Sequence, residues 1–152
     1  MKLKLALIPA SSFCVNLRKT MKPEEWRKLS REVRSKANRT CQYCGWQEDY
    51  DTQEYTHLHE VWEFDEKNQV QKLVGFECIC PTCHNVHHWG FAQVSGVDMD
   101  KLLKHACKVN GCSALEFKKH IEESFQEWNR RSEIDWQVDL GDCIAKNKGE
   151  QI

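Results

Sequence analysis

Two Cys-x-x-Cys pairs are the feature that most restricts how this chain can fold. Cys41 and Cys44 form the first pair, Cys80 and Cys83 form the second, and 35 residues lie between the two pairs. Four thiolates supplied by two such pairs can complete a tetrahedral Zn²⁺ site, and a site closed by four cysteines leaves no coordination position for a substrate. The spacing therefore predicts one structural zinc ion that staples two distant segments and takes no part in catalysis.

The cysteine count also argues against a secreted, disulfide-bonded domain. The 152 residues include nine cysteines, and an odd number cannot be fully paired within one chain. The apolar stretch near the N-terminus is short and ends at Pro9, and no run approaches the roughly 18 residues of a membrane span. We therefore expect a soluble protein of the reducing cytoplasm. The thiols that we interpret as ordinary buried or surface groups are Cys14, Cys78, Cys107, Cys112 and Cys143.

Hydrophobic periodicity predicts a mixture of helices and strands. Apolar stripes with helical spacing predict helices over residues 23–38 and 98–109, and a capping-box pattern at Ser113 opens a third helix. Residues 55–64 and 69–78 are rich in aromatic and β-branched side chains and flank a tight polar turn, which predicts a β-hairpin. With 40% hydrophobic and 30% charged residues, the composition is that of one globular α+β domain.

Both ends of the chain show the two-residue alternation that is typical of half-buried strands. Leucines alternate with lysines over residues 2–8, and apolar side chains alternate with mainly acidic ones over residues 133–140. A lone strand leaves its backbone unpaired, and the opposite charges favour pairing of the two segments with each other. We therefore predict a small antiparallel sheet made by the chain ends. Residues 144–152 are predicted to be a flexible tail.

Histidines cluster around the predicted hairpin and the second cysteine pair. His59 lies on the first predicted strand, and His84 and His88 lie four apart on a helix that we expect to begin after Cys83. The order strand, turn, strand, helix would bring His59 close to His84 and His88, because the zinc fixes the start of that helix. Such imidazoles favour a second metal site with open coordination positions. The histidines without a firm assignment are His57, His87, His105 and His120, of which the last two are interpreted as surface side chains.

Three motifs of the chain resemble one nuclease family. They are Cys41-Gln-Tyr-Cys44-Gly, Leu58-His59-Glu60-Val61 and Cys80-Pro-Thr-Cys83-His84-x-x-x-His88. In this order, over residues 41–88, they resemble the HNH endonucleases, which are ββα-metal or His-Me finger enzymes with a treble-clef zinc site. The resemblance implies an α+β fold with a zinc-stapled ββα centre and flanking helices. It also implies a single HNH-like zinc domain over residues 1–143.

The resemblance further implies a metal-dependent endonuclease that hydrolyses DNA phosphodiester bonds. In the family a strand histidine acts as general base, while a neighbouring Asp or His and helix residues hold Mg²⁺ or another divalent cation on the scissile phosphate. His84 and His88 match the helix positions, and His59 matches the strand. If Leu58-His59 is the matching pair, His59 is the base and the strand ligand is missing; if it is His59-Glu60, His59 is a ligand and Glu60 is the base. An alternative is a catalytically silent HNH-like module that binds nucleic acid or a protein partner.

Charge is distributed unevenly along a chain whose net charge is −1. Residues 18–39 carry nine Lys or Arg and three Glu, a local charge of +6, whereas residues 48–66 carry eight acids and no basic residue. A solvated helix face and a phosphate-contacting helix both explain the basic run. Because the resemblance implies DNA as the partner, we predict phosphate contacts from this helix. The predicted contact residues are Arg27, Lys28, Arg31, Arg34, Lys36 and Arg39.

Overall fold

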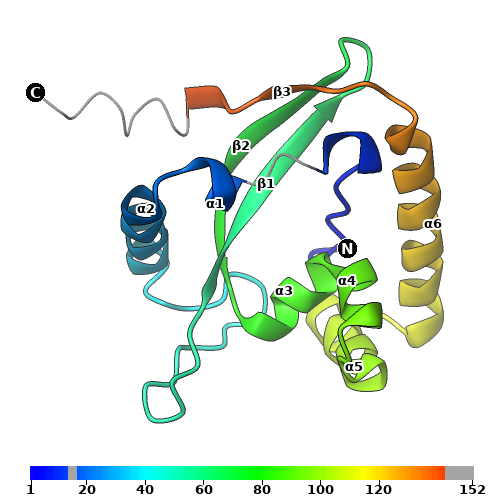
Figure 1. Ribbon diagram of the computed structural model, residues 1–152. Coiled ribbons are helices and arrows are strands. Elements are labelled where there is room, and N and C mark those ends of the chain that lie inside the picture. Colours follow the sequence, from blue (N-terminus) through cyan, green and yellow to red (C-terminus); the bar gives the residue numbers. More distant parts are fainter. Residues whose placement is uncertain (14–16, 143–152) are drawn as a thin grey trace, which may run out of the picture.

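The computed structural model describes residues 1–13 and 17–142, which form a three-stranded mixed sheet with helices around it (Figure 1). Cys14, Cys143 and the predicted tail 144–152 lie outside the described residues. The described elements confirm an α+β fold in which a β-hairpin leads directly into a helix. In chain order they are η1 (Ala10–Ser12), α1 (Leu17–Thr20), α2 (Pro23–Lys36), β1 (His57–Asp65), β2 (Val70–Ile79), α3 (Pro81–His87), α4 (Trp89–Val94), α5 (Met99–Asn110), α6 (Ala114–Ser132) and β3 (Gln137–Asp139).

The central hairpin forms where the sequence predicts it. β1 and β2 pair antiparallel along their whole length, from His57 opposite Ile79 to Asp65 opposite Val70. The register shifts once, at a bulge after Val61. Aromatic and β-branched side chains suit a pleated, half-buried surface, which explains why this segment pairs rather than coils into a helix. The hairpin thus carries the strand histidines to the same end of the molecule as the second cysteine pair.

Helix ends follow the capping signals of the sequence. α5 begins after Asp98, whose side chain accepts a backbone N–H of the first turn, and ends at Gly111, which adopts a left-handed φ of 62°. Ser113 and Glu116 form the predicted capping box at the start of α6. α2 covers the predicted helix 23–38 apart from its last two residues. Local side-chain chemistry therefore fixed these boundaries correctly.

The predicted antiparallel sheet of the two chain ends is wrong. β3 joins the hairpin instead, because Gln137–Asp139 pairs parallel with Val70–Lys72 of β2. The alternation predicted over 133–140 is present, with Trp136 buried and its acidic neighbours exposed. The Trp136 ring packs against Phe64 with centroids 5.1 Å apart. Burial of such a ring contributes about 2–3 kcal/mol, whereas a cross-strand charge pair contributes about 1 kcal/mol at most, so core packing decides the partner.

The N-terminal segment runs between the hairpin and α6 as extended chain without a strand partner (Figure 1). The Asn110 side chain accepts the N–H of Leu3 and donates to its carbonyl, both at 2.8 Å. The N–H of Ala6 donates to the His87 carbonyl at 2.9 Å, and the Trp128 indole donates to a carbonyl of the same segment. Side chains and a helix end thus satisfy the backbone that a second strand was predicted to satisfy.

The main core lies on the side of the hairpin that carries α3 to α6, while α2 packs on its other side (Figure 1). This core includes the cysteine cluster, so the predicted zinc site is continuous with the apolar core. None of the described helices combines the length and hydropathy that a bilayer-spanning segment requires. The core side chains beside the cysteines are Leu3, Ile79, Val86, Trp89, Ala92, Leu102, Ala106 and Phe117.

Candidate metal centres

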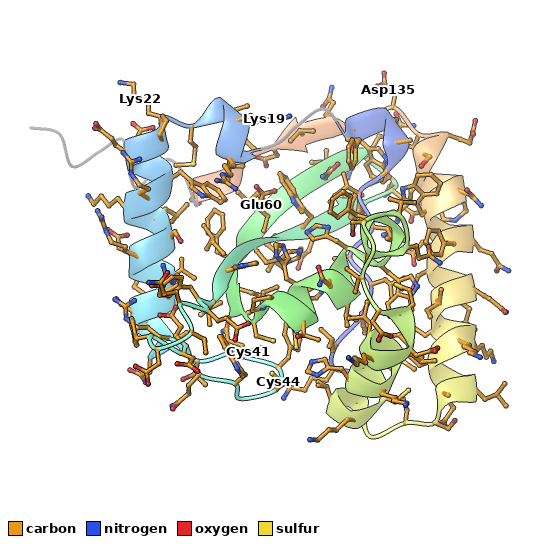
Figure 2. The ribbon with its side chains drawn as sticks, turned by 60° about the horizontal axis from the view of Figure 1, so that its bottom comes forward. Lys19, Lys22, Cys41, Cys44, Glu60 and Asp135 are labelled. Carbon is orange, nitrogen blue, oxygen red and sulfur yellow. The ribbon has the colours of Figure 1, made fainter. Side chains whose placement is uncertain are left out.

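The four predicted zinc ligands meet where the hairpin leads into α3. The Sγ atoms of Cys41, Cys44, Cys80 and Cys83 all lie within 4.8 Å of one another, and those of Cys44 and Cys80 are 3.6 Å apart. Zn–S bonds of about 2.3 Å in a tetrahedron place the sulfur atoms about 3.8 Å apart. The cluster therefore has the dimensions of a zinc site. Figure 2 shows Cys41 and Cys44 on the loop that packs beside the end of the hairpin.

Hydrogen bonds between the clustered thiols shift their pKa values in opposite directions. Hydrogen bonds from the Cys80 and Cys83 thiols lower the pKa of Cys41. The same hydrogen bonds raise the pKa of Cys80 to about 12 and also raise the pKa of Cys83. The protein groups alone therefore favour one thiolate among protonated neighbours. Zinc requires deprotonated thiols, so metal binding at this cluster is coupled to proton release.

His105 approaches the cysteine cluster from α5. Its Nε2 lies 3.1 Å from the Sγ of Cys83, where an N–H can donate to a thiolate. The interpretation of His105 as a surface side chain is wrong, since it is half-buried and bonded. The missed signal is helical spacing, because His105 lies on the stripe that includes Leu102, Ala106 and Val109. Such outer partners of a metal ligand fix its orientation.

His59, His84 and His88 come together as the order of elements predicts. One ring nitrogen of each lies within 4.8 Å of the others. His84 lies on α3 and His88 caps its end, where the His88 N–H donates to the His84 carbonyl at 3.0 Å. Cys83 directly precedes His84, so the cysteine cluster fixes this helix against β1. His57 also reaches the group, with its Nδ1 2.9 Å from that of His84.

Two of these imidazoles, His84 and His88, are neutral at physiological pH. Burial, followed by the neighbouring imidazoles, lowers the pKa of His84 to about 2 and that of His88 to about 4. A neutral ring offers a nitrogen lone pair, and imidazole ligands suit Zn²⁺, Fe²⁺, Ni²⁺ and Cu²⁺. The third ring, His59, is 7% exposed. The three imidazoles, of which His84 and His88 are neutral, therefore fit a divalent cation with open coordination positions.

A second group shares His59 and was not foreseen. Glu77 lies directly opposite His59 in the hairpin register, and its Oε2 is 3.7 Å from the His59 Nδ1 and 3.6 Å from the His87 Nε2. The Tyr43 hydroxyl donates to the other carboxylate oxygen at 2.6 Å. Burial would raise the pKa of Glu77, but the nearby His59 and His87 rings and the hydrogen bond from Tyr43 outweigh it and lower that pKa. The hairpin register was the signal that could have identified Glu77.

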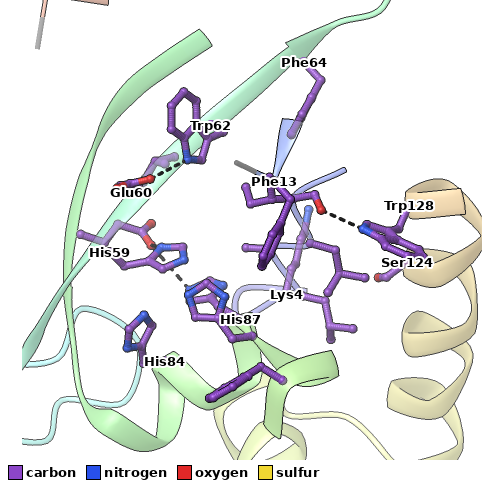
Figure 3. Close-up of a pocket in the computed structure, with 18 of the residues that line it drawn as sticks. Lys4, Phe13, His59, Glu60, Trp62, Phe64, His84, His87, Ser124 and Trp128 are labelled. Atoms are coloured by element: carbon purple, nitrogen blue, oxygen red, sulfur yellow. Dashed lines mark hydrogen bonds and ion pairs between the residues drawn. The ribbon is translucent and has the colours of Figure 1, made fainter. Parts of the chain in front are cut away.

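These histidines line a cleft of about 980 Å³ formed by the hairpin, the N-terminal segment, α3 and α6 (Figure 3). Glu60 lines the same cleft and accepts a hydrogen bond from the Trp62 indole at 3.1 Å. Burial raises the pKa of Glu60, which makes its carboxylate a stronger base than an exposed one. The basic side chains that line the cleft are Lys2, Lys4, Arg18, Lys19 and Arg131.

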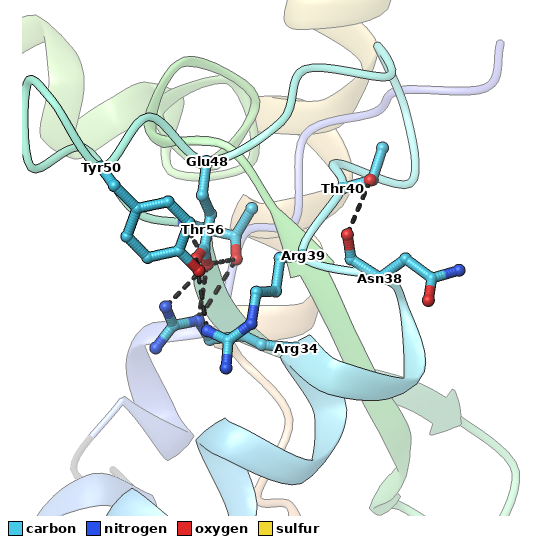
Figure 4. A network of polar contacts seen from close by, with 7 residues as sticks. All are labelled: Arg34, Asn38, Arg39, Thr40, Glu48, Tyr50 and Thr56. Atoms are coloured by element: carbon cyan, nitrogen blue, oxygen red, sulfur yellow. Dashed lines mark hydrogen bonds and ion pairs between the residues drawn. The ribbon is translucent and has the colours of Figure 1, made fainter.

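Two members of the predicted DNA-contacting set hold a buried carboxylate (Figure 4). A guanidinium nitrogen of Arg34 lies 2.7 Å from Glu48 Oε1, and one of Arg39 lies 3.4 Å from Oε2. The Thr56 hydroxyl donates to the same carboxylate at 2.5 Å. DNA contact by the whole set stays a prediction. The members that are exposed, none of which lines the cleft, are Arg27, Lys28, Arg31 and Lys36.

Comparison with protein-family models, with curated proteins and with solved structures finds no match for this chain. The structure itself supports a four-cysteine cluster suited to zinc and histidine clusters suited to another metal. Both lie near a β-hairpin followed by a helix, which is the arrangement that the HNH resemblance implies.

Proposed function

We propose that this chain is a metal-dependent endonuclease of the HNH type that hydrolyses DNA phosphodiester bonds. The observation that carries the proposal is the convergence of His59, His84 and His88 on a cleft whose mixed lining includes five lysines and arginines and three glutamates. His59, His84 and His88 would hold a divalent cation, which would supply Lewis-acid stabilisation of the phosphoryl charge and of the leaving 3′-oxygen. The basic lining favours a polyanionic substrate over a small neutral one.

The chain's own groups supply phosphate binding and proton transfer. Lys4 and Arg18 are exposed on the cleft lining, where they can contact the phosphates of the substrate strand. Glu60 accepts the proton of the attacking water, which its burial favours by raising the pKa of the carboxyl group. This assignment corresponds to the pairing in which His59 is a ligand and Glu60 is the base.

Nicking of supercoiled plasmid by the zinc-loaded protein tests the proposal. We expect cleavage with Mg²⁺, Mn²⁺ or Co²⁺ and none when the added cation is omitted. His84→Ala should lower the rate strongly while the zinc content stays unchanged, because His84 belongs to the second centre. Glu60→Gln should lower the rate roughly 100-fold or more, as loss of a general base does. Glu63→Gln is the matched control, because Glu63 is an exposed acid on the same strand outside the cleft.

Two results would redirect the assignment. If His84→Ala cleaves as fast as the wild type, the histidine cluster is not the catalytic centre. If no cation supports cleavage while DNA binding persists, the chain is the catalytically silent module.

A further inference from the structure

Two polar side chains beside the candidate cation site, His87 and Glu77, have no part in the reaction described above. His59 and His87 are 7% and 5% exposed. Among the described residues, the His59 Nδ1 and both ring nitrogens of His87 have no hydrogen-bond partner. Buried polar atoms without partners are destabilising and therefore rare. The carboxylate of Glu77 faces both rings, so it is the group that can interact with these nitrogens.

A second cation held by His59, Glu77 and His87 is the first explanation to consider, and the ring geometry opposes it. The His59 and His87 rings are stacked, with centroids 4.4 Å apart and planes only 9° apart. The lone pair of an imidazole nitrogen lies in the ring plane, so two stacked rings direct their lone pairs along parallel planes. One cation cannot lie in both of these planes.

The first histidine cluster has the opposite geometry. The His59 ring plane is inclined by 78° to that of His84 and by 63° to that of His88. Inclined planes intersect, so lone pairs from these rings can meet at one cation. His59 therefore belongs to the cluster with His84 and His88. Its stacking on His87 does not serve to bind a shared cation.

The position of the Glu77 carboxylate indicates which nitrogen of His59 carries the proton. Tyr43 holds one carboxylate oxygen at 2.6 Å, and the other oxygen faces the His59 Nδ1 at 3.7 Å and the His87 Nε2 at 3.6 Å. These are ion-pair distances rather than direct hydrogen bonds. A carboxylate there favours a proton on Nδ1, which leaves the lone pair on the Nε2 of His59. Metal-binding histidines typically donate their second N–H to a carboxylate in this way.

We propose that Glu77 is the positioning residue of the cation site and that His87 supports it. Through the Nδ1–H of His59, Glu77 fixes the tautomer and orientation of that ring, so that Nε2 is available to a cation. His87 stacks on His59 and shares the same carboxylate oxygen, which limits ring rotation. The biological purpose of the cation rests on the proposed nuclease function, whereas the geometry of its site does not.

Titration of the zinc-loaded protein with Co²⁺, followed by visible absorption, tests the role of Glu77. We expect one Co²⁺ per chain at the histidines and an affinity roughly 10- to 100-fold weaker in Glu77→Gln, as for other outer partners of metal ligands. Glu63→Gln removes the same charge from the same hairpin and should bind Co²⁺ like the wild type. Equal affinity in Glu77→Gln and wild type would overturn the proposal.

His87→Phe separates support by stacking from ligation. Phenylalanine keeps an aromatic ring against His59 but removes both nitrogens, so we expect the variant still to bind one Co²⁺ per chain. A wild type that binds two Co²⁺ ions beyond zinc, of which His87→Phe loses one, would show that His87 is a ligand and would refute the proposal.

The tautomer of His59 is the readout that a merely structural Glu77 would not change. Two-bond ¹H–¹⁵N correlation spectra of the zinc-loaded protein, without further cation, should show a proton on Nδ1 in the wild type. In Glu77→Gln the proton should move toward Nε2, because the carboxylate no longer favours Nδ1–H. An unchanged tautomer would count against the proposal.

Failure of this inference can be distinguished from failure of the proposed function. A wild type that cleaves no DNA but shows the Co²⁺ and tautomer effects supports the role of Glu77 and refutes the nuclease assignment. If the wild type cleaves DNA while Glu77→Gln binds Co²⁺ with wild-type affinity, the nuclease assignment is supported and the role of Glu77 is refuted. If Glu77→Gln does not fold, Tyr43→Phe removes only the hydroxyl that holds the carboxylate and should weaken Co²⁺ binding in the same direction.

Discussion

Glu48 is the residue whose replacement should most clearly destabilise the fold. Its side chain is only 1% exposed and accepts hydrogen bonds or ion pairs from Arg34, Arg39 and Thr56. Arg39 lies two residues before Cys41. The network therefore connects the loop that carries Cys41 and Cys44 to α2 and to the start of β1 (Figure 4). We predict that Glu48→Gln lowers the free energy of unfolding by about 3 kcal/mol at pH 7.

The magnitude follows from the carboxyl group's protonation. Burial alone would raise the pKa of Glu48, but hydrogen bonds from Thr56 and Arg34 outweigh it and lower that pKa from 4.5 to about 2. This difference from the unfolded chain corresponds to about 3 kcal/mol at neutral pH, which agrees with the cost of breaking a buried ion pair. Because the folded pKa is lowered, the stabilisation is complete above about pH 4.5 and is lost as the pH falls toward about 2.

Urea unfolding of the zinc-loaded wild type and Glu48→Gln measures this difference. The difference in unfolding free energy between the wild type and Glu48→Gln should be about 1 kcal/mol smaller at pH 4 than at pH 7. The reason is that Glu48 in the unfolded wild type is already partly protonated at pH 4. Asp51→Asn is the matched control, since Asp51 is an exposed acid in the same loop. A difference at pH 7 below about 1 kcal/mol, the size of a surface ion pair, would refute the reasoning. So would a difference that is equally large at pH 4.

Three further predictions concern zinc and DNA. Cys83→Ser should lose zinc and fold together, measured by metal content and circular dichroism, and a folded, metal-free wild type would contradict this. His105→Phe should weaken zinc binding roughly 10-fold in a chelator competition, because its N–H faces the Cys83 sulfur; unchanged affinity would show that this contact is incidental. Arg18→Ser should weaken DNA binding and reduce the slope of log affinity against log salt by about 1, as loss of one phosphate contact does. Arg27→Ser should have a smaller effect, since Arg27 lies outside the cleft, and the reverse order would identify α2 as the main DNA contact.

Local signals in the sequence carry most of the fold. The hairpin and the three longest helices follow from periodicity and capping residues, because those signals act within a few positions of the chain. The two Cys-x-x-Cys pairs are the one long-range signal with defined geometry, and they correctly bring residues 41–44 next to residues 80–83. Once the cysteines meet, the proximity of His59 and His84 follows from connectivity alone.

The errors arise where distant segments compete for a partner. Charge matching of the chain ends is a weak term, and burial of Trp136 against Phe64 outweighs it. DNA contact by the basic run stays a prediction, and composition alone did not show that two of its members, Arg34 and Arg39, also hold Glu48. Glu77 was missed because a single glutamate on a strand carries no spacing signal of its own.

The histidine site depends on the cysteine cluster, whereas the cysteine cluster does not depend on the histidines. Cys80 caps α3 with its sulfur, and Cys83 lies in the first turn, so the cysteine cluster holds the start of this helix. His84 and His87 follow on the same helix and reach His59 only while that start is held against the hairpin. Zinc loss should therefore abolish the histidine site, because a seven-residue helix is not stable by itself. Removal of a histidine leaves all four sulfur ligands in place, so the zinc site should survive it.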